Sequence, residues 1–166
     1  MALISFQGNP LNTCGNLPEI GSTAPEFSLT NSRLKEVTLL TYAGKRKVLS
    51  IVPSLDTPTC AASARMFNQK AGSLENTVVL VISADLPFAQ ARFCEAEGIK
   101  NVTALSTFRS SFAKDYGITL IDTFLAGLTG RAVLIIDENN KVIYSELVAE
   151  LADEPNYADA LAALSD

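Results

Sequence analysis

Short apolar runs that alternate with helical segments constrain the fold of this chain more than any other feature. Residues 48–52, 77–82 and 102–105 are largely apolar and each is short enough to be a buried strand. Because the helices between such strands must cover the sheet that they connect, the alternation predicts an α/β protein with helices on both faces of a central sheet. In sheets of this kind, functional sites lie at the carboxyl ends of the strands.

The segments between these strands carry helix signals. Apolar residues recur at helical spacing from Cys60 to Leu74. A second helix is expected to start near Asp85 and Pro87 and to end at Gly98, because glycine is a typical helix stop. In this reading Asp85 is a helix cap rather than a catalytic acid.

The remainder of the chain completes a compact domain. Residues 1–16 are expected to form a small hairpin with a turn at 8–10. The basic triplet 45–47 is expected to be a solvated turn. The other expected elements are strands at 27–30, 37–40, 132–136 and 142–145, a short helix at 110–116, and a last helix that carries Tyr157, Leu161 and Leu164. The sequence therefore predicts one domain over residues 1–166.

Composition excludes several classes of function. Histidine is absent, which removes Ser-His-Asp and Cys-His hydrolases and His-ligated zinc or haem. Three cysteines cannot form a four-thiolate metal site, and nothing else indicates a metal or an organic cofactor. The net charge of −5 argues against a nucleic-acid partner. With no signal-peptide pattern and no apolar span of about 20 residues, we expect no membrane partner and a cytoplasmic location, with the periplasm as the alternative.

One cysteine stands where a nucleophile is favoured. Residues 53–60 join the strand at 48–52 to the next helix, with Thr57 as a good N-cap and Pro58 at the first helical position. Cys60 then falls at the third helical residue, where free N–H groups and the helix dipole favour a thiolate. The Thr57 hydroxyl could both cap the helix and touch the sulfur. The alternative is that Cys60 only begins the apolar stripe of its helix.

Cys94, Arg131 and Cys14 are the other residues with chemistry relevant to a site around Cys60. Cys94 lies about two turns into the second helix, where a cysteine is usually a packing residue. Pairing with Cys60 needs Cα atoms within about 7 Å, so it would require local unwinding of that helix. Arg131 opens the strand at 132–136 and could reach and stabilise a thiolate at the sheet end, or simply be a surface arginine. For Cys14, in a loop-like context, we expect no role.

The segment from Pro53 to Cys60 resembles the Pro-x-x-x-Thr-x-x-Cys signature of the peroxiredoxins. Further blocks resemble one subfamily, the bacterial thiol peroxidases or atypical two-cysteine peroxiredoxins; these are residues 6–10, 67–69, 82–90, 92–94, 105–109 and 131–133. They occur in the right order and spacing over nearly the whole chain. The resemblance implies a thioredoxin-like fold, with a central mixed sheet flanked by helices and an added N-terminal hairpin.

The resemblance also implies a thiol-specific peroxidase that reduces hydrogen peroxide and alkyl or lipid hydroperoxides. Cys60 matches the peroxidatic cysteine and Cys94 the resolving cysteine, which form an intrachain disulfide. Thr57 and Arg131 match residues that hold the thiolate and polarise the peroxide, and Pro53 matches the proline that shields the sulfenic acid. Thioredoxin is the implied reductant and a homodimer the implied assembly. The main alternative is a peroxide sensor or redox relay that uses the same disulfide switch.

Overall fold

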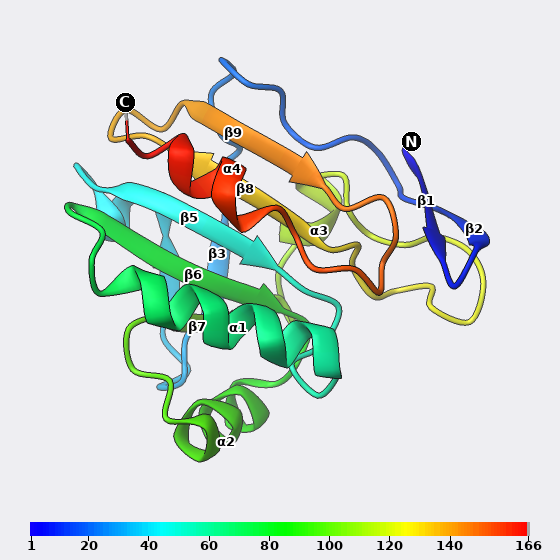
Figure 1. Ribbon diagram of the computed structural model, residues 1–166, viewed down its shortest axis with the longest axis horizontal. Helices are drawn as coiled ribbons and strands as arrows, with labels where there is room; N and C mark the ends of the chain where they lie inside the picture. The colour runs from blue at the N-terminus through cyan, green and yellow to red at the C-terminus, as the bar shows by residue number, and fades with distance from the viewer. Residues whose placement is uncertain (166) are drawn as a thin grey trace.

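A seven-stranded mixed sheet forms the centre of the computed structural model, which describes residues 1–165. The strands are β1 (Leu3–Phe6), β2 (Asn9–Asn12), β3 (Ser28–Thr30), β4 (Glu36–Thr38), β5 (Arg46–Ile51), β6 (Thr77–Ser83), β7 (Thr103–Ser106), β8 (Ala132–Ile136) and β9 (Val142–Leu147). The helices are η1 (Leu39–Tyr42, a 3-10 turn), α1 (Pro58–Ala71), α2 (Pro87–Glu97), α3 (Phe112–Asp115) and α4 (Tyr157–Ala162). This architecture confirms the predicted α/β sheet and the separate N-terminal hairpin (Figure 1).

The sheet has the strand order β4-β3-β7-β6-β5-β8-β9. Strands β5, β6 and β7 are parallel neighbours, whereas β8 runs antiparallel to β5, with Ile51 opposite Ala132. The carboxyl ends of β5 and β6 therefore lie at the same edge of the sheet as the start of β8. Figure 1 shows the hairpin of β1 and β2 beyond this same edge. Segments that are far apart in the sequence thus come together there.

The two faces of the sheet are covered differently. Side chains alternate along β5, so that Leu49 and Val48 face opposite sides of the sheet, as strand geometry requires. The face of Val48 packs against Phe67 of α1 and against α4. The face of Leu49 packs against Phe112 of α3 and the nearby Tyr116, whose rings stack at 4.3 Å. In Figure 1, α1 and α4 accordingly lie in front of the sheet and α3 behind it.

Several boundaries differ from the sequence-based expectations. The strand expected at 37–40 ends at Thr38, because the next four residues form η1, where Thr41 accepts a hydrogen bond from the Thr38 N–H at 3.0 Å. Helix α1 ends at Ala71, before Leu74, and α4 ends before Leu164.

The turn of the hairpin is also displaced from its expected position. Gln7 and Gly8 both have positive φ angles, 52° and 82°, which suit a tight two-residue hairpin turn. Asn9 and Pro10 therefore belong to β2, where they pair with residues of β1.

Lys47 is buried in β5 and does not lie in a solvated turn. Its Nζ donates hydrogen bonds to the Lys45 carbonyl and to Asn140 Oδ1, both at 2.9 Å. Burial lowers the pKa of this ammonium, against the opposing effect of Asp137 and Glu138. The apolar stem packs in the sheet while the charged end finds oxygen partners, so the expectation of a solvated turn is wrong for Lys47.

None of the helices within residues 1–165 combines the length and the hydropathy needed to cross a membrane.

Candidate active site

Cys60 is fully buried in the first turn of α1. Thr57 is the N-cap residue and Pro58 the first helical residue, so Cys60 is the third, as predicted. Because β5 ends at Ile51, the intervening loop crosses the edge of the sheet at which β6 ends and β8 begins. The position combines burial with the N-terminal end of a helix, where an anion is stabilised.

Arg131 contacts the Cys60 sulfur directly. Its Nη1 donates to Sγ of Cys60 at 3.1 Å, and its Nε donates to the Leu151 carbonyl at 3.1 Å. The side chain is 3% exposed, so the alternative of a surface arginine is wrong. The pairing of β5 with β8 places Arg131 at this edge, and the Leu151 carbonyl orients its guanidinium. The guanidinium is thus a fixed, buried hydrogen-bond donor aimed at the sulfur.

Thr57 and Pro53 are the other two predicted site residues near Arg131. The Thr57 hydroxyl donates to the Ser54 carbonyl at 2.9 Å, so it closes a turn within the loop. The expectation that this hydroxyl caps α1 is therefore wrong. Thr57 is exposed and Pro53 is buried. Both line the same pocket as Arg131.

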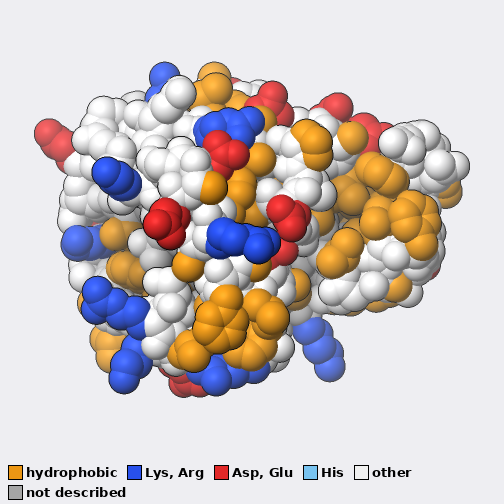
Figure 2. Space-filling view, turned by 90° about the horizontal axis from the view of Figure 1, so that it is seen from below, with side chains coloured by type: hydrophobic (Ala, Val, Ile, Leu, Met, Phe, Trp, Pro, Cys, Tyr) orange, Lys and Arg blue, Asp and Glu red, His pale blue; other side chains and the backbone are white. Residues whose placement is uncertain are grey.

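The pocket beside Arg131 has a volume of about 330 Å³. Its walls are chiefly apolar side chains from the hairpin, from the segment before β8 and from the segment after β9; they include Phe6, Leu125, Leu128 and Leu151. Figure 2 shows hydrophobic side chains gathered at the end of the molecule that carries β1 and β2. The buried Cys60 lies behind this pocket, because Arg131 both lines the pocket and touches the sulfur.

Cys94 is half-buried on α2, which is a regular helix at this position. Together with Phe93, it packs against the apolar cluster that contains Cys60 and Ile99. All three cysteines are free thiols. Burial raises the pKa of the Cys94 thiol, which keeps it protonated and weakly nucleophilic while α2 is intact. Cys14 is exposed and sits at 3.9 Å from the Lys114 carbonyl.

Asp85 was expected to cap α2, and this expectation is wrong. Leu86 occupies the N-cap position, and the Asp85 carboxylate accepts hydrogen bonds from Ser54, Leu55 and Ser83. Tertiary donors from the neighbouring loop thus replace the local helix N–H groups as its partners. Its place just after β6, at the carboxyl end of a strand, was the signal that could have identified Asp85 as part of the site.

Within residues 1–165, no three Cys, Asp or Glu side chains gather in an arrangement that would hold a metal ion.

The chain is similar to known proteins over nearly its whole length. Residues 19–161 match the redoxin family model. The chain belongs to the redoxin family. This redoxin is 53% identical to the thiol peroxidase of Corynebacterium glutamicum over 165 residues, which cover 99% of this chain and 100% of that protein.

Two solved structures extend the comparison. A peroxiredoxin-like protein from Aquifex aeolicus superposes with a TM-score of 0.94 at 38% identity, covering 99% of this chain and 96% of that one. A thiol peroxidase from Chromobacterium violaceum gives a TM-score of 0.91 at 25% identity, covering 98% and 95%. These matches confirm the resemblance to the thiol peroxidases and the thioredoxin-like peroxiredoxin fold that it implied.

Proposed function

We propose that this redoxin is a thioredoxin-dependent peroxidase in which Cys60 attacks the peroxide and Cys94 resolves the product. The contact of 3.1 Å between Arg131 Nη1 and the Cys60 sulfur carries the proposal. It places a fixed cation beside a thiol at a helix N-terminus, at the inner end of an apolar pocket. Reduction of a peroxide needs this combination of a stabilised thiolate and a donor for the leaving oxygen.

In the first step the Cys60 thiolate attacks the terminal oxygen of a hydroperoxide. The O–O bond breaks as the S–O bond forms, giving a sulfenic acid on Cys60 and an alkoxide, which takes a proton and leaves as the alcohol. Arg131 stabilises the thiolate before the step and the developing negative charge on the leaving oxygen during it. The Thr57 hydroxyl lies in the same pocket and can turn from Ser54 to the bound peroxide. Pro53 shields the sulfenic acid from water.

In the second step the Cys94 thiol attacks the sulfenic sulfur, which forms the disulfide and releases water. Cys94 is on intact α2, so this helix must unwind locally before the two sulfur atoms can bond. Unwinding also exposes Cys94 to water, which removes the burial that raises its pKa. The same motion therefore brings the resolving thiol to Cys60 and makes it a better nucleophile. Two electrons from the dithiol of thioredoxin then restore both thiols.

The apolar pocket supports alkyl hydroperoxides as preferred substrates. Phe6, Leu125, Leu128 and Leu151 offer contacts to an alkyl or aryl group that hydrogen peroxide lacks. The reaction at sulfur is the same for both substrates. We therefore expect cumene hydroperoxide to have the lower KM.

We also propose a homodimer. Leu86 and Phe88 at the start of α2 and Phe108 after β7 are exposed large apolar side chains, which a second copy could cover. Sedimentation equilibrium should give twice the chain mass, and Phe88→Asp should lower that mass. A wild-type monomer at micromolar concentration would contradict this assembly.

Thiol counting after a single oxidation tests the chemistry. The reduced protein is mixed with one equivalent of cumene hydroperoxide, free thiols are counted, and peptides are mapped by mass spectrometry. The wild-type protein and Cys14→Ser, the matched control, should each lose two thiols and yield a Cys60–Cys94 peptide. Cys94→Ser should lose one thiol and then fail to be recycled by thioredoxin. Survival of all thiols, or full turnover by Cys60→Ser, would overturn the assignment.

A further inference from the structure

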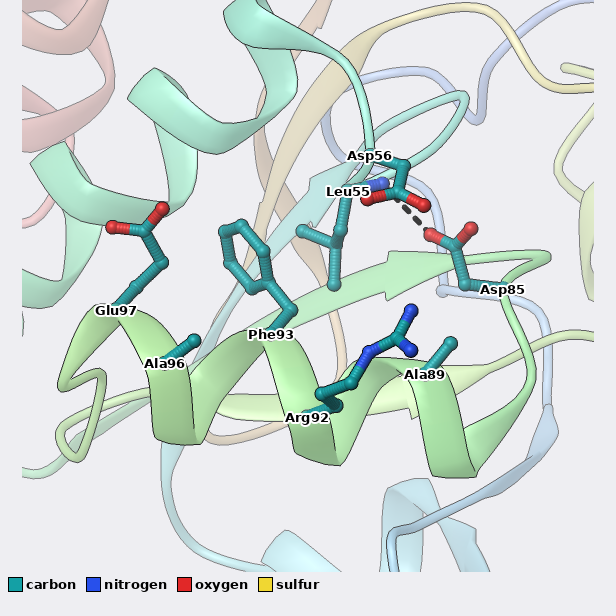
Figure 3. A pocket seen from close by; sticks show the side chains of 8 residues that line it. All are labelled: Leu55, Asp56, Asp85, Ala89, Arg92, Phe93, Ala96 and Glu97. Carbon is teal, nitrogen blue, oxygen red and sulfur yellow. Dashed lines mark hydrogen bonds between the residues drawn. The ribbon is translucent and has the colours of Figure 1, made fainter.

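The Asp85 carboxylate ties the loop that precedes Cys60 to the end of β6. Its Oδ1 accepts from Ser54 Oγ at 2.7 Å, and its Oδ2 accepts from the Leu55 N–H at 2.7 Å and from Ser83 Oγ at 2.8 Å. Figure 3 shows the bond from Leu55 to Asp85 at the rim of a pocket of about 230 Å³. Three donors from two segments thus converge on one carboxylate, which can only accept.

The same bonds continue to the helix that carries Cys94. Gln90 Nε2 donates to Ser83 Oγ at 3.0 Å and to the Leu105 carbonyl at 2.9 Å. Gln90 is 1% exposed and lies one helical turn before Cys94 on α2. A chain of hydrogen bonds therefore runs from the Cys60 loop through Asp85 and Ser83 to α2.

Both ends of this chain of bonds must move when the disulfide forms. Cys60 is buried behind its loop, and Cys94 is held in regular helix. The bonds of Asp85 are made in the folded arrangement, in which Cys60 also contacts Arg131. They must weaken before the loop and α2 can leave that arrangement together.

We propose that Asp85 is a positioning residue that holds the Cys60 loop in its peroxide-reactive conformation and opposes the motion that leads to the disulfide. This inference rests on the proposed function, because it assigns Asp85 a part in that reaction cycle. Asp85 acts on both steps with opposite sign. It speeds the attack on peroxide by fixing the loop, and it slows the resolution step by delaying release of the loop and α2.

The pocket beside Asp85 also holds a positively charged side chain from α2. In Figure 3 the Arg92 guanidinium, which comes from α2, points toward the Asp85 carboxylate across the pocket. Asp56 and Glu97 bring two further carboxylates to the lining. Arg92 therefore supplies positive charge on the side of the pocket that would move with α2.

Asp85→Ala tests the inference, with Asp137→Ala as the matched control. Asp137 accepts from the N–H groups of Asn139 and Lys141 in the turn between β8 and β9, so its loss also removes backbone hydrogen bonds but leaves the Cys60 loop alone. Rapid-quench alkylation and mass spectrometry would follow the loss of the Cys60 thiol and the formation of the disulfide as separate rates. A third readout is the fraction of Cys60 driven to sulfinic acid by excess cumene hydroperoxide.

In Asp85→Ala the peroxide step should be about fivefold slower and disulfide formation about fivefold faster, the size expected for the net contribution of a single ordinary hydrogen bond. Less sulfinic acid should form, because the sulfenic acid is trapped sooner. Asp137→Ala should match the wild-type protein in all three. If Asp85→Ala fails to fold, Asp85→Asn, which keeps the shape and one acceptor oxygen, should show the same signs at smaller size.

Equal or parallel changes in the two rates would overturn the role of Asp85, because general loosening of the fold predicts no opposite signs. Such a result would leave the proposed function intact, provided that the wild-type protein forms the Cys60–Cys94 disulfide. If the wild-type protein forms no disulfide with peroxide, the proposed function itself fails.

Discussion

Replacing Arg131 with alanine removes the cation that touches the Cys60 sulfur. The bond from Nη1 to Sγ, at 3.1 Å, is buried and charge-assisted once the thiolate forms. A hydrogen bond to a charged group contributes about 1.5–3 kcal/mol. If this stabilisation is lost in the attack on peroxide, the second-order rate constant should fall by about 10- to 150-fold. Arg131→Lys keeps the charge but cannot contact both the Cys60 sulfur and the Leu151 carbonyl, so its rate constant should lie between those of the wild-type protein and Arg131→Ala.

Competition kinetics with cumene hydroperoxide would measure these rate constants. Arg46→Ala is the matched control, because the Arg46 guanidinium also donates to two backbone carbonyls, those of Leu164 at 2.6 Å and Glu75 at 3.0 Å. These contacts lie at the opposite end of β5 from the Cys60 loop. Arg46→Ala should lose stability while its peroxide rate stays within about twofold of the wild-type rate.

A folded Arg131→Ala protein that reacts at the wild-type rate would refute this reasoning. Circular dichroism establishes whether each variant is folded before its kinetics are compared. Arg131→Ala also loses the hydrogen bond to the Leu151 carbonyl, which is a structural effect. Arg46→Ala loses hydrogen bonds of the same kind away from the site, so it measures that structural effect by itself. A large drop in rate for both arginine variants would likewise assign the loss to destabilisation and not to the cation.

Three further outcomes are expected. Phe6→Ala should raise the KM for cumene hydroperoxide by about fivefold, because about 1 kcal/mol of apolar contact is lost, and should leave hydrogen peroxide kinetics unchanged. Hydrogen bonds from the N–H groups of Ala152 and Gly8 lower the pKa of Glu150, so its stabilising effect is present above the ordinary value of 4.5 and is lost as the pH falls through the lowered pKa. The difference in melting temperature between wild type and Glu150→Gln should therefore shrink from pH 7 to pH 3. Phe67→Ala, at a site 1% exposed, should lower the free energy of unfolding in urea by about 3–5 kcal/mol.

Local rules predicted the elements of this chain better than their ends. Thr57 before Pro58 located the start of α1, and Gly98, whose φ is 65°, located the end of α2. Such signals act within one helical turn, so neighbouring residues suffice to read them. Leu74 and Leu164 continued the apolar spacing but lie beyond their helices, because side-chain spacing alone does not mark where the backbone leaves the helix.

In the candidate site, the position of Cys60 could be read from the sequence, whereas its surroundings could not. The sequence by itself determined that Cys60 lies in the first turn of a helix at the carboxyl end of a strand, because both facts follow from residues within a few positions of it. The tertiary structure alone decided what surrounds it. Arg131 is 71 residues away and reaches the sulfur only because β8 pairs antiparallel with β5, and Asp85 exchanges its expected local partners for Ser54 and Leu55 once β6 lies beside β5. Contacts of this kind depend on strand order and register, which hydrophobic burial of the whole sheet sets and no short segment specifies.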